Sequence, residues 1–240
     1  MPFIEFSPHI GCPINCSEYC IQDRINKNYN GKRMLSFDDF KKFLSSVPTN
    51  VLVGFAGFSE PFINPEFIDM VEYTEKKGYT TAIFTTLYNV TNDQISQIRN
   101  IDFSAFVVHL PDGKHFKIPY SAKWGEALHA VTHLIPSATY MSMNNKFRSS
   151  GREHLHDTKN LKYKRWGYCH ESGLFVCPNG DVYPCCMVVG LPNMVIGNLN
   201  KSSYSSLENQ KQKDFPYKPC HYCSQFVGYR HRIFNWLKNL

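Results

Sequence analysis

The chain has 240 residues, of which 42% are apolar and 19% charged, and this composition suits a folded protein with a sizeable core. It contains no run of about 18 apolar residues and no basic segment followed by an apolar one at its start, so neither a membrane span nor a signal peptide is predicted. We therefore expect a cytoplasmic protein, in which nine cysteines indicate metal binding or catalysis. The net charge is +6, but the basic residues are scattered, so no nucleic-acid partner is predicted.

The first half of the chain alternates between short apolar runs and amphipathic segments. The apolar runs predict strands at residues 3–7, 51–56, 80–85, 103–110 and 139–143. Between them, helices are predicted from Ser36 onward and at residues 65–77, 91–99 and 121–134. This alternation with short connections predicts an α/β fold, a partial TIM-like barrel of about five to six parallel strands. The active site of such a fold lies at the carboxyl ends of the strands.

The pattern changes after about residue 145. Residues 144–165 are polar and irregular, and residues 174–183 then predict a β-hairpin without an intervening helix. We place a domain boundary in the polar region, with the barrel core at residues 1–148 and a small C-terminal domain at residues 149–240. Residues 227–240 are basic and amphipathic, and they are expected to form a terminal helix.

Three cysteines, Cys12, Cys16 and Cys20, lie within nine residues after the first predicted strand. Thiolates are preferred ligands of iron–sulfur clusters. Three of them leave one iron of a four-iron cluster open to a substrate or cofactor. The alternatives are a zinc site or three unrelated thiols, but structural zinc sites usually have paired Cys-x-x-Cys motifs and four ligands. The triplet therefore favours an open [4Fe-4S] cluster.

The triplet resembles that of the radical S-adenosylmethionine (SAM) superfamily, which is usually spaced Cys-x3-Cys-x2-Cys with an aromatic residue before the last cysteine. Here the spacing is Cys-x3-Cys-x3-Cys, with Tyr19 in the aromatic position. After the second predicted strand, the Gly-Phe-Ser-Glu-Pro run at residues 57–61 resembles the family's Gly-Gly-Glu-Pro motif, with Phe58 replacing the second glycine. The resemblance implies that the cluster and this turn bind SAM.

The resemblance also implies where SAM contacts the chain. In the family, the turn after the second strand holds the methionine amino group, and the end of the third strand often supplies a polar contact, here Thr85. Arg148 and Arg152 follow the fifth predicted strand, and either could pair with the SAM carboxylate or with an anionic substrate. The cofactor-binding residues expected are Gly57, Ser59, Glu60, Pro61, Thr85 and Arg148.

Six further cysteines lie near the C-terminus: Cys169, Cys177, Cys185, Cys186, Cys220 and Cys223. A zinc ribbon built on the Cys220-x-x-Cys223 pair is one alternative. The spacing from Cys169 through Gly180 to Cys185 resembles the Cys-x(9–15)-Gly-x4-Cys signature of SPASM and Twitch extensions, which bind auxiliary four-iron clusters. Since only one cysteine pair follows, the shorter Twitch form is expected, with one auxiliary [4Fe-4S] cluster held by Cys169, Cys185, Cys220 and Cys223.

Two cysteines remain outside this ligand set. Cys177 lies inside the predicted hairpin and Cys186 follows a predicted ligand, so both are interpreted as non-ligands. Cys186 stays open as a substitute for Cys185.

The resemblance implies a radical SAM oxidoreductase. Reductive cleavage of SAM would give a 5′-deoxyadenosyl radical that abstracts a substrate hydrogen, and the auxiliary cluster would accept the remaining electron. The expected outcome is a two-electron oxidation of a small molecule or a peptide side chain. The alternatives are a radical SAM enzyme that crosslinks or epimerises a peptide, and a non-enzymatic zinc or iron–sulfur binding module. No leader-binding domain fits before Cys12, which favours a small molecule.

The implied chemistry also requires a partner. An external electron donor such as flavodoxin or ferredoxin is expected to reduce the open cluster. The residue patterns assign no catalytic side chain, and they leave the identity of the substrate open.

Overall fold

The structure is a computed structural model that describes residues 2–14, 20–57, 59–111, 121–142, 167–169, 173–214, 217 and 226–228. Within these residues, no helix is long and apolar enough to cross a membrane. The predicted boundary near residue 148 lies outside them, so the division into two domains stays a prediction.

Eight strands form the main sheet. They are β1 (Phe3–Phe6), β2 (Leu52–Phe55), β3 (Thr81–Thr85), β4 (Phe103–Leu110), β5 (Ala138–Ser142), β7 (Leu174–Val176), β8 (Asp181–Tyr183) and β9 (Gly197–Asn198). Their order is β5-β4-β3-β2-β1-β7-β8-β9, and β1 to β5 pair in parallel. Among the described residues, no pairing joins β5 to β9, so the sheet is open. The predicted α/β fold with a partial parallel barrel is confirmed.

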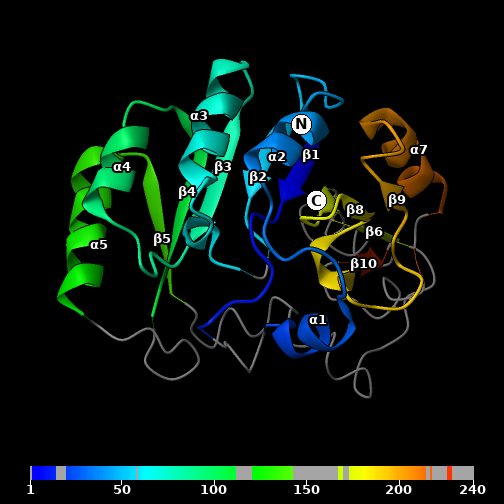
Figure 1. Ribbon diagram of the computed structural model, residues 1–240, viewed down its shortest axis with the longest axis horizontal. Helices are drawn as coiled ribbons and strands as arrows, with labels where there is room; N and C mark the ends of the chain where they lie inside the picture. The colour runs from blue at the N-terminus through cyan, green and yellow to red at the C-terminus, as the bar shows by residue number, and fades with distance from the viewer. Residues whose placement is uncertain are drawn as a thin grey trace, which may run out of the picture.

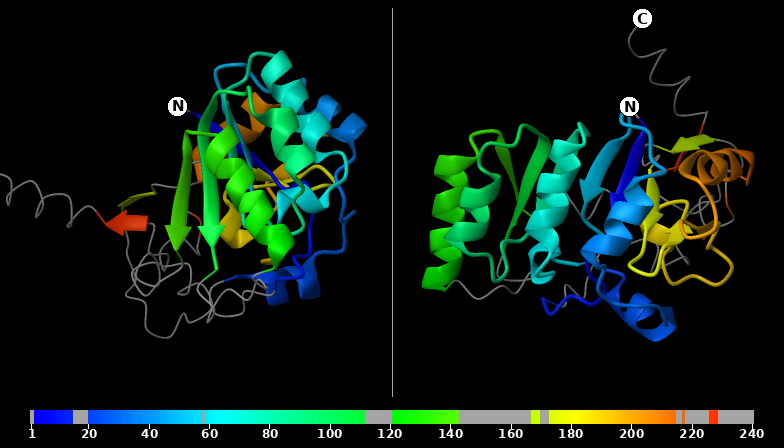
Figure 2. Two further views of the ribbon diagram at one scale, coloured as in Figure 1. Left: turned by 90° about the vertical axis from the view of Figure 1, so that its left-hand side faces the viewer. Right: turned by 45° about the horizontal axis from the view of Figure 1, so that its top comes forward.

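Five helices accompany the parallel strands: α1 (Gln22–Asn28), α2 (Phe37–Leu44), α3 (Phe67–Lys76), α4 (Asn92–Ile98) and α5 (Ala122–Leu134). Helices α2 to α5 form a layer along one face of the sheet (Figures 1 and 2). Helix α2 is capped at its start, since the Ser36 side chain accepts a hydrogen bond from the Asp39 amide. The helix predicted from residue 65 begins at Phe67, after a 3-10 turn, η1 (Pro61–Ile63), and α1 was not predicted.

The core between the sheet and the helix layer is rich in aromatic rings. Phe40 of α2 packs against Phe6 of β1 and Phe55 of β2, with ring centroids 5.2 and 5.5 Å apart. Phe55 also meets Phe67 of α3 edge to face at 5.3 Å. Each such pair adds about 0.5–1.5 kcal/mol beyond the burial of its area. This packing fixes β1 and β2, whose carboxyl ends lead into the candidate site.

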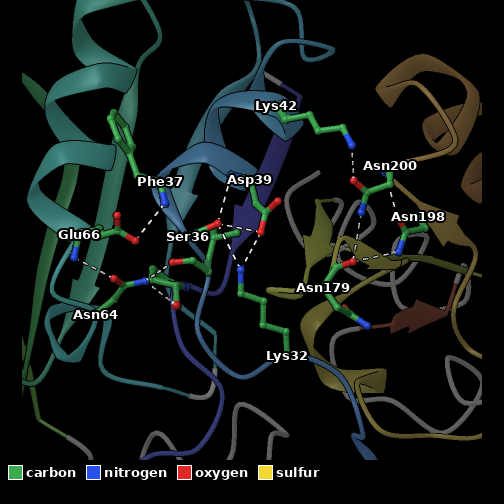
Figure 3. Close-up of polar contacts among 12 residues, drawn as sticks. Lys32, Ser36, Phe37, Asp39, Lys42, Asn64, Glu66, Asn179, Asn198 and Asn200 are labelled. Carbon is green, nitrogen blue, oxygen red and sulfur yellow. Dashed lines mark hydrogen bonds and ion pairs between the residues drawn. The ribbon is translucent and has the colours of Figure 1, made fainter.

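The predicted hairpin is present and belongs to the same sheet as the barrel strands. Its first strand, β7, pairs in parallel with β1, and β8 returns antiparallel to β7. Polar contacts also join the hairpin to α2. Lys42 of α2 donates a hydrogen bond to Asn200 at 2.7 Å, and Asn200 in turn donates to the carbonyl oxygen of Asn179 in the hairpin turn (Figure 3). The hairpin therefore extends the parallel sheet by a sixth strand.

The remaining described segments surround the hairpin. They are a 3-10 turn, η4 (Cys186–Val188), helix α7 (Tyr204–Asp214), and a two-stranded sheet of β6 (Gly167–Cys169) and β10 (Phe226–Gly228). The β6–β10 pair is antiparallel and sets Cys169 opposite Phe226. The terminal helix expected from residue 227 therefore does not begin there, because Val227 and Gly228 are in a strand.

Candidate metal centre and cofactor site

The loop with the three predicted cysteines begins where β1 ends. Gly11 precedes Cys12 with a φ of +105°, a backbone conformation that favours glycine. Buried Ile14 and Ile21 anchor the loop on either side of the undescribed residues 15–19. Cys12 and Cys20 are both half-buried, whereas Cys16 lies outside the described residues. The three-cysteine ligand set therefore stays a prediction.

Gln22, which was not predicted as a site residue, lies directly beside this loop. It is the first residue of α1 and is 3% exposed. Its Oε1 accepts a hydrogen bond from the Cys12 amide at 3.4 Å. Its Nε2 is buried and has no hydrogen-bond partner among the described residues. A buried donor of this kind beside Cys12 suits a site that is completed by a group rich in acceptor atoms.

The turn after β2 needs glycine at its first position. Gly57 has a φ of +92°, and a Cβ added there would lie 2.9 Å from the Phe175 ring of β7 and 3.1 Å from the Ser7 hydroxyl. Two residues later, the Ser59 hydroxyl lies 3.2 Å from Nδ1 of His9, a residue that follows β1 and was not predicted. The turn thus contacts both the hairpin and the start of the cysteine loop.

Glu60 is fully buried and joins the ends of β2 and β3. Its carboxylate accepts hydrogen bonds from four donors: the amide and hydroxyl of Thr86, the hydroxyl of Thr85 and the amide of Phe62. Burial raises the pKa of Glu60, and these hydrogen bonds oppose that shift. Thr85 is also buried, and its hydroxyl accepts a bond from the Leu87 amide. Both side chains are thereby engaged within the protein.

Asn64 holds the same turn against the loop after β1. Its Nδ2 donates to the carbonyl oxygens of Pro8 at 2.8 Å and Leu35 at 2.7 Å, and its Oδ1 accepts from the Glu66 amide at 2.9 Å (Figure 3). The residue is completely buried. Its position before a proline indicated an extended conformation or a turn, but nothing in the sequence indicated these long-range contacts.

The C-terminal cysteines differ sharply in their surroundings. Cys185 is half-buried, and its sulfur accepts a hydrogen bond from the Met187 amide at 3.2 Å. Hydrogen bonds to sulfur are a regular feature of iron–sulfur sites. Cys177 is completely buried in an apolar cluster, and this burial raises the pKa of its thiol. Cys186 is buried in the same cluster. The surroundings thus suit Cys185 to ligation better than Cys177.

Helix α1 is bonded to the turn that follows Cys185. Arg24 donates from Nε to the Val189 carbonyl oxygen at 3.0 Å and from Nη2 to that of Met187 at 2.6 Å. Asn28 donates to the Gly190 carbonyl oxygen at 2.8 Å. A Cβ at Gly190 would lie 3.2 Å from the Arg24 carbonyl oxygen, so glycine permits this close approach. We refer to these five residues as the α1–turn contact.

The α1–turn contact brings together loops that are far apart in the sequence. Beneath it lies an apolar cluster that includes Ile21, Ile25, Phe175 and Val189, and both Cys20 and Cys185 pack against this cluster. Burial lowers the pKa of Arg24, and the nearby Cys185 sulfur opposes that shift. The first and second cysteine regions therefore share one supporting element.

The structure describes only part of the predicted site. Among the described residues, no three cysteine, histidine or acidic side chains are close enough together to hold a metal ion. Cys16, Cys220, Cys223 and Arg148 lie outside the described residues, and only the backbone of Cys169 is described. The complete ligand sets and the arginine contact therefore stay predictions.

Comparisons with known proteins agree with this architecture. Residues 168–225 match the family model of SPASM, an iron–sulfur cluster-binding domain. The fold is similar to the crystal structure of BtrN in complex with AdoMet and 2-DOIA, with a TM-score of 0.68, 16% identity, and coverage of 95% of this chain and 93% of that one. It is also similar to native anSMEcpe with bound AdoMet and Cp18Cys peptide, at a TM-score of 0.59, 12% identity, and coverage of 95% and 89%. A search among curated proteins finds no match.

The chain thus has the architecture of radical SAM enzymes with a SPASM-type extension. The resemblance drawn from the two cysteine patterns is confirmed at this level, as is the iron–sulfur character of the C-terminal region. The SPASM match spans all six C-terminal cysteines, from Cys169 to Cys223.

Proposed function

We propose that this protein is a radical SAM oxidoreductase that removes two electrons from a small molecule or a peptide side chain. The observation that carries the proposal is the packing of Cys20 and Cys185 against one apolar cluster under the α1–turn contact. An enzyme that passes an electron from substrate to an auxiliary cluster needs its two cluster sites close to one active site, and the shared packing of Cys20 and Cys185 supports such an arrangement.

Cys12, Cys16 and Cys20 are the proposed ligands of the first [4Fe-4S] cluster. The cluster held by these residues would, together with bound SAM, supply the radical chemistry for hydrogen abstraction. The protein contributes the loop geometry: Gly11 allows the turn into Cys12, and buried Ile21 holds the chain after Cys20. External reduction by flavodoxin or ferredoxin in the cytoplasm is part of the proposal.

The proposed SAM-binding residues have two different roles. Gly57 and Ser59 are half-buried at the surface of the turn, where a ligand can reach them. Glu60 and Thr85 are buried and bonded to one another, so they fix the turn rather than present their polar groups to a ligand. Pro61 begins the η1 turn that this pair supports, and Arg148 is the proposed partner of the SAM carboxylate.

Cys169, Cys185, Cys220 and Cys223 are the proposed ligands of the auxiliary [4Fe-4S] cluster, within a domain at residues 149–240. Cys185 already has a hydrogen-bond donor to its sulfur in the Met187 amide. The β6–β10 pairing sets Cys169 opposite Phe226, and the Cys220–Cys223 pair directly precedes that strand in the sequence. Four thiolates close the cluster to substrate, which leaves it the role of electron acceptor.

A peptide-modifying radical SAM enzyme is the second candidate. The fold accommodates both kinds of substrate, since the BtrN structure contains 2-DOIA and the anSMEcpe structure contains a peptide. This chain matches BtrN at the higher TM-score, 0.68 against 0.59, and we therefore favour a small molecule.

Metal analysis of anaerobically reconstituted protein tests the proposal. We expect about eight irons per chain with acid-labile sulfide, and an electron paramagnetic resonance signal that changes when SAM is added. One or two zinc ions per chain without iron would instead establish a zinc-binding module and overturn the proposal.

A further inference from the structure

The Gln22 side chain is the starting point for an inference that rests on the proposed first cluster. The residue is 3% exposed, and its carboxamide lies beside the Cys12 backbone, where Oε1 accepts a hydrogen bond from the Cys12 amide at 3.4 Å. This bond shows which end of the carboxamide is the oxygen, because the Cys12 amide needs an acceptor and Nε2 can only donate. The donor end, Nε2, is left buried without a partner among the described residues.

A buried amide donor without an acceptor is costly, since it has lost its bonds to water and gained none. Three other buried polar atoms with no partner among the described residues are the Thr81 hydroxyl, the Tyr204 hydroxyl and Glu208 Oε2. Thr81 begins β3, at the end opposite Thr85, and the other two lie on α7. Gln22 therefore differs from these three in lying beside a predicted ligand cysteine.

The position of Gln22 on the chain limits what can accept its hydrogen bond. Its carboxamide contacts the Cys12 amide, and the residue lies two positions after Cys20 in the sequence. Thiolate and sulfide sulfurs are the acceptors that a cluster brings to this place, and amide hydrogen bonds to such sulfurs are one means by which proteins set a cluster's reduction potential.

We propose that Gln22 Nε2 donates a hydrogen bond to a sulfur atom of the [4Fe-4S] cluster held by Cys12, Cys16 and Cys20. Reduction adds negative charge to the cluster sulfurs, so the donor stabilises the reduced state more than the oxidised one. Gln22 thereby raises the reduction potential of the cluster that must be reduced before SAM is cleaved. The same residue holds the Cys12 amide through Oε1, so one side chain positions the loop and tunes the cluster.

The test is a redox titration of the reconstituted protein with Gln22→Met, which keeps a long side chain but removes the donor. The first cluster is followed through its paramagnetic resonance signal, which is assigned by its response to SAM in a parallel sample. We expect the reduction equilibrium to shift about tenfold toward the oxidised state, which is about 59 mV to more negative potential for one electron. Iron content should equal that of the wild type.

Asn30→Met is the matched control, because Asn30 is an exposed amide just beyond α1, and its potential should equal the wild-type value. Gln22→Glu tests the role of the donor end of the carboxamide separately from that of the acceptor end. It keeps the acceptor for Cys12 and loses the amide donor, and it should lower the potential at least as much as Gln22→Met.

Three results would overturn the inference. An unchanged potential in Gln22→Met with a SAM-responsive cluster would refute the sulfur bond and leave the proposed function intact. A weaker affinity for SAM with an unchanged potential would assign the donor to SAM instead. A wild-type protein without a SAM-responsive cluster would refute the proposed function and this inference together.

Discussion

Arg24 donates from Nη2 to the carbonyl oxygen of Met187 at 2.6 Å, across 163 positions of the sequence. Arg24 follows the cysteine triplet on α1, and Met187 lies two residues after Cys185. This bond and its neighbours fix the turn that leads out of the second cysteine region against the helix that leads out of the first. These bonds therefore hold the turn after Cys185 in a fixed position relative to α1.

The α1–turn contact should contribute to stability. Replacing Arg24 by Gln removes a charged donor with two hydrogen bonds to backbone carbonyls, and we expect the free energy of unfolding to fall by about 1.5–3 kcal/mol. Urea denaturation of the metal-free protein measures this change. Lys27→Gln on the exposed face of the same helix is the control and should change stability by less than about 0.5 kcal/mol. Equal effects of the two substitutions would contradict the contact's role.

Glu60 should be more important for stability than for direct binding of SAM. In Glu60→Gln, an amide nitrogen would replace one of two oxygens that accept four hydrogen bonds, so donor would face donor. We expect a loss of about 1–3 kcal/mol by denaturation. Glu72→Gln, at an exposed position of α3, should be neutral. A normal stability together with lost SAM binding would instead place the carboxylate in contact with the ligand.

The sequence predicted the parallel strands because buried apolar runs separated by polar turns are a strong local signal. It did not predict α1, whose seven residues include a single buried apolar side chain, Ile25, and therefore show no helical periodicity. The pairing of β7 with β1 joins segments about 170 residues apart, and no local pattern indicates it. Arg24 and Gln22 were missed for a related reason, since their partners are backbone groups, which are the same at every position.

Gly57 should tolerate no side chain. Its φ of +92° disfavours other residues, and a Cβ would lie 2.9 Å from the Phe175 ring. We expect Gly57→Ala to cost about 1–3 kcal/mol through strain and overpacking together. Gly78→Ala separates these causes, because Gly78 has a φ of +78° but nothing within 4 Å of an added Cβ. If both variants lose the same stability, the contact with Phe175 does not constrain the turn.

His9 should make the stability of the metal-free protein depend on pH. Half-burial, and secondarily the charge of Arg33, lower the pKa of His9 in the folded state. The unfolded chain, with a histidine pKa of about 6.5, therefore binds more protons at mildly acidic pH. Stability due to His9 is present above about pH 6.5 and is lost as the pH falls below it.

Denaturation at pH 7.5 and pH 5.5 measures this dependence. His9→Gln should lose less stability between the two conditions than the wild type, whereas His129→Gln, at an exposed position of α5, should behave like the wild type. If His9→Gln loses as much stability between pH 7.5 and pH 5.5 as the wild type does, a group other than His9 causes the pH dependence.

We propose that the two cysteine sets hold clusters with different tasks on one support. The most direct measurement is 5′-deoxyadenosine formation by anaerobically reconstituted protein with SAM and a strong reductant. We expect the wild type to form it, Cys20→Ala to abolish it, and Cys185→Ala to retain part of it while substrate oxidation is impaired. If a wild-type protein with intact clusters forms no 5′-deoxyadenosine, the protein is not a radical SAM enzyme.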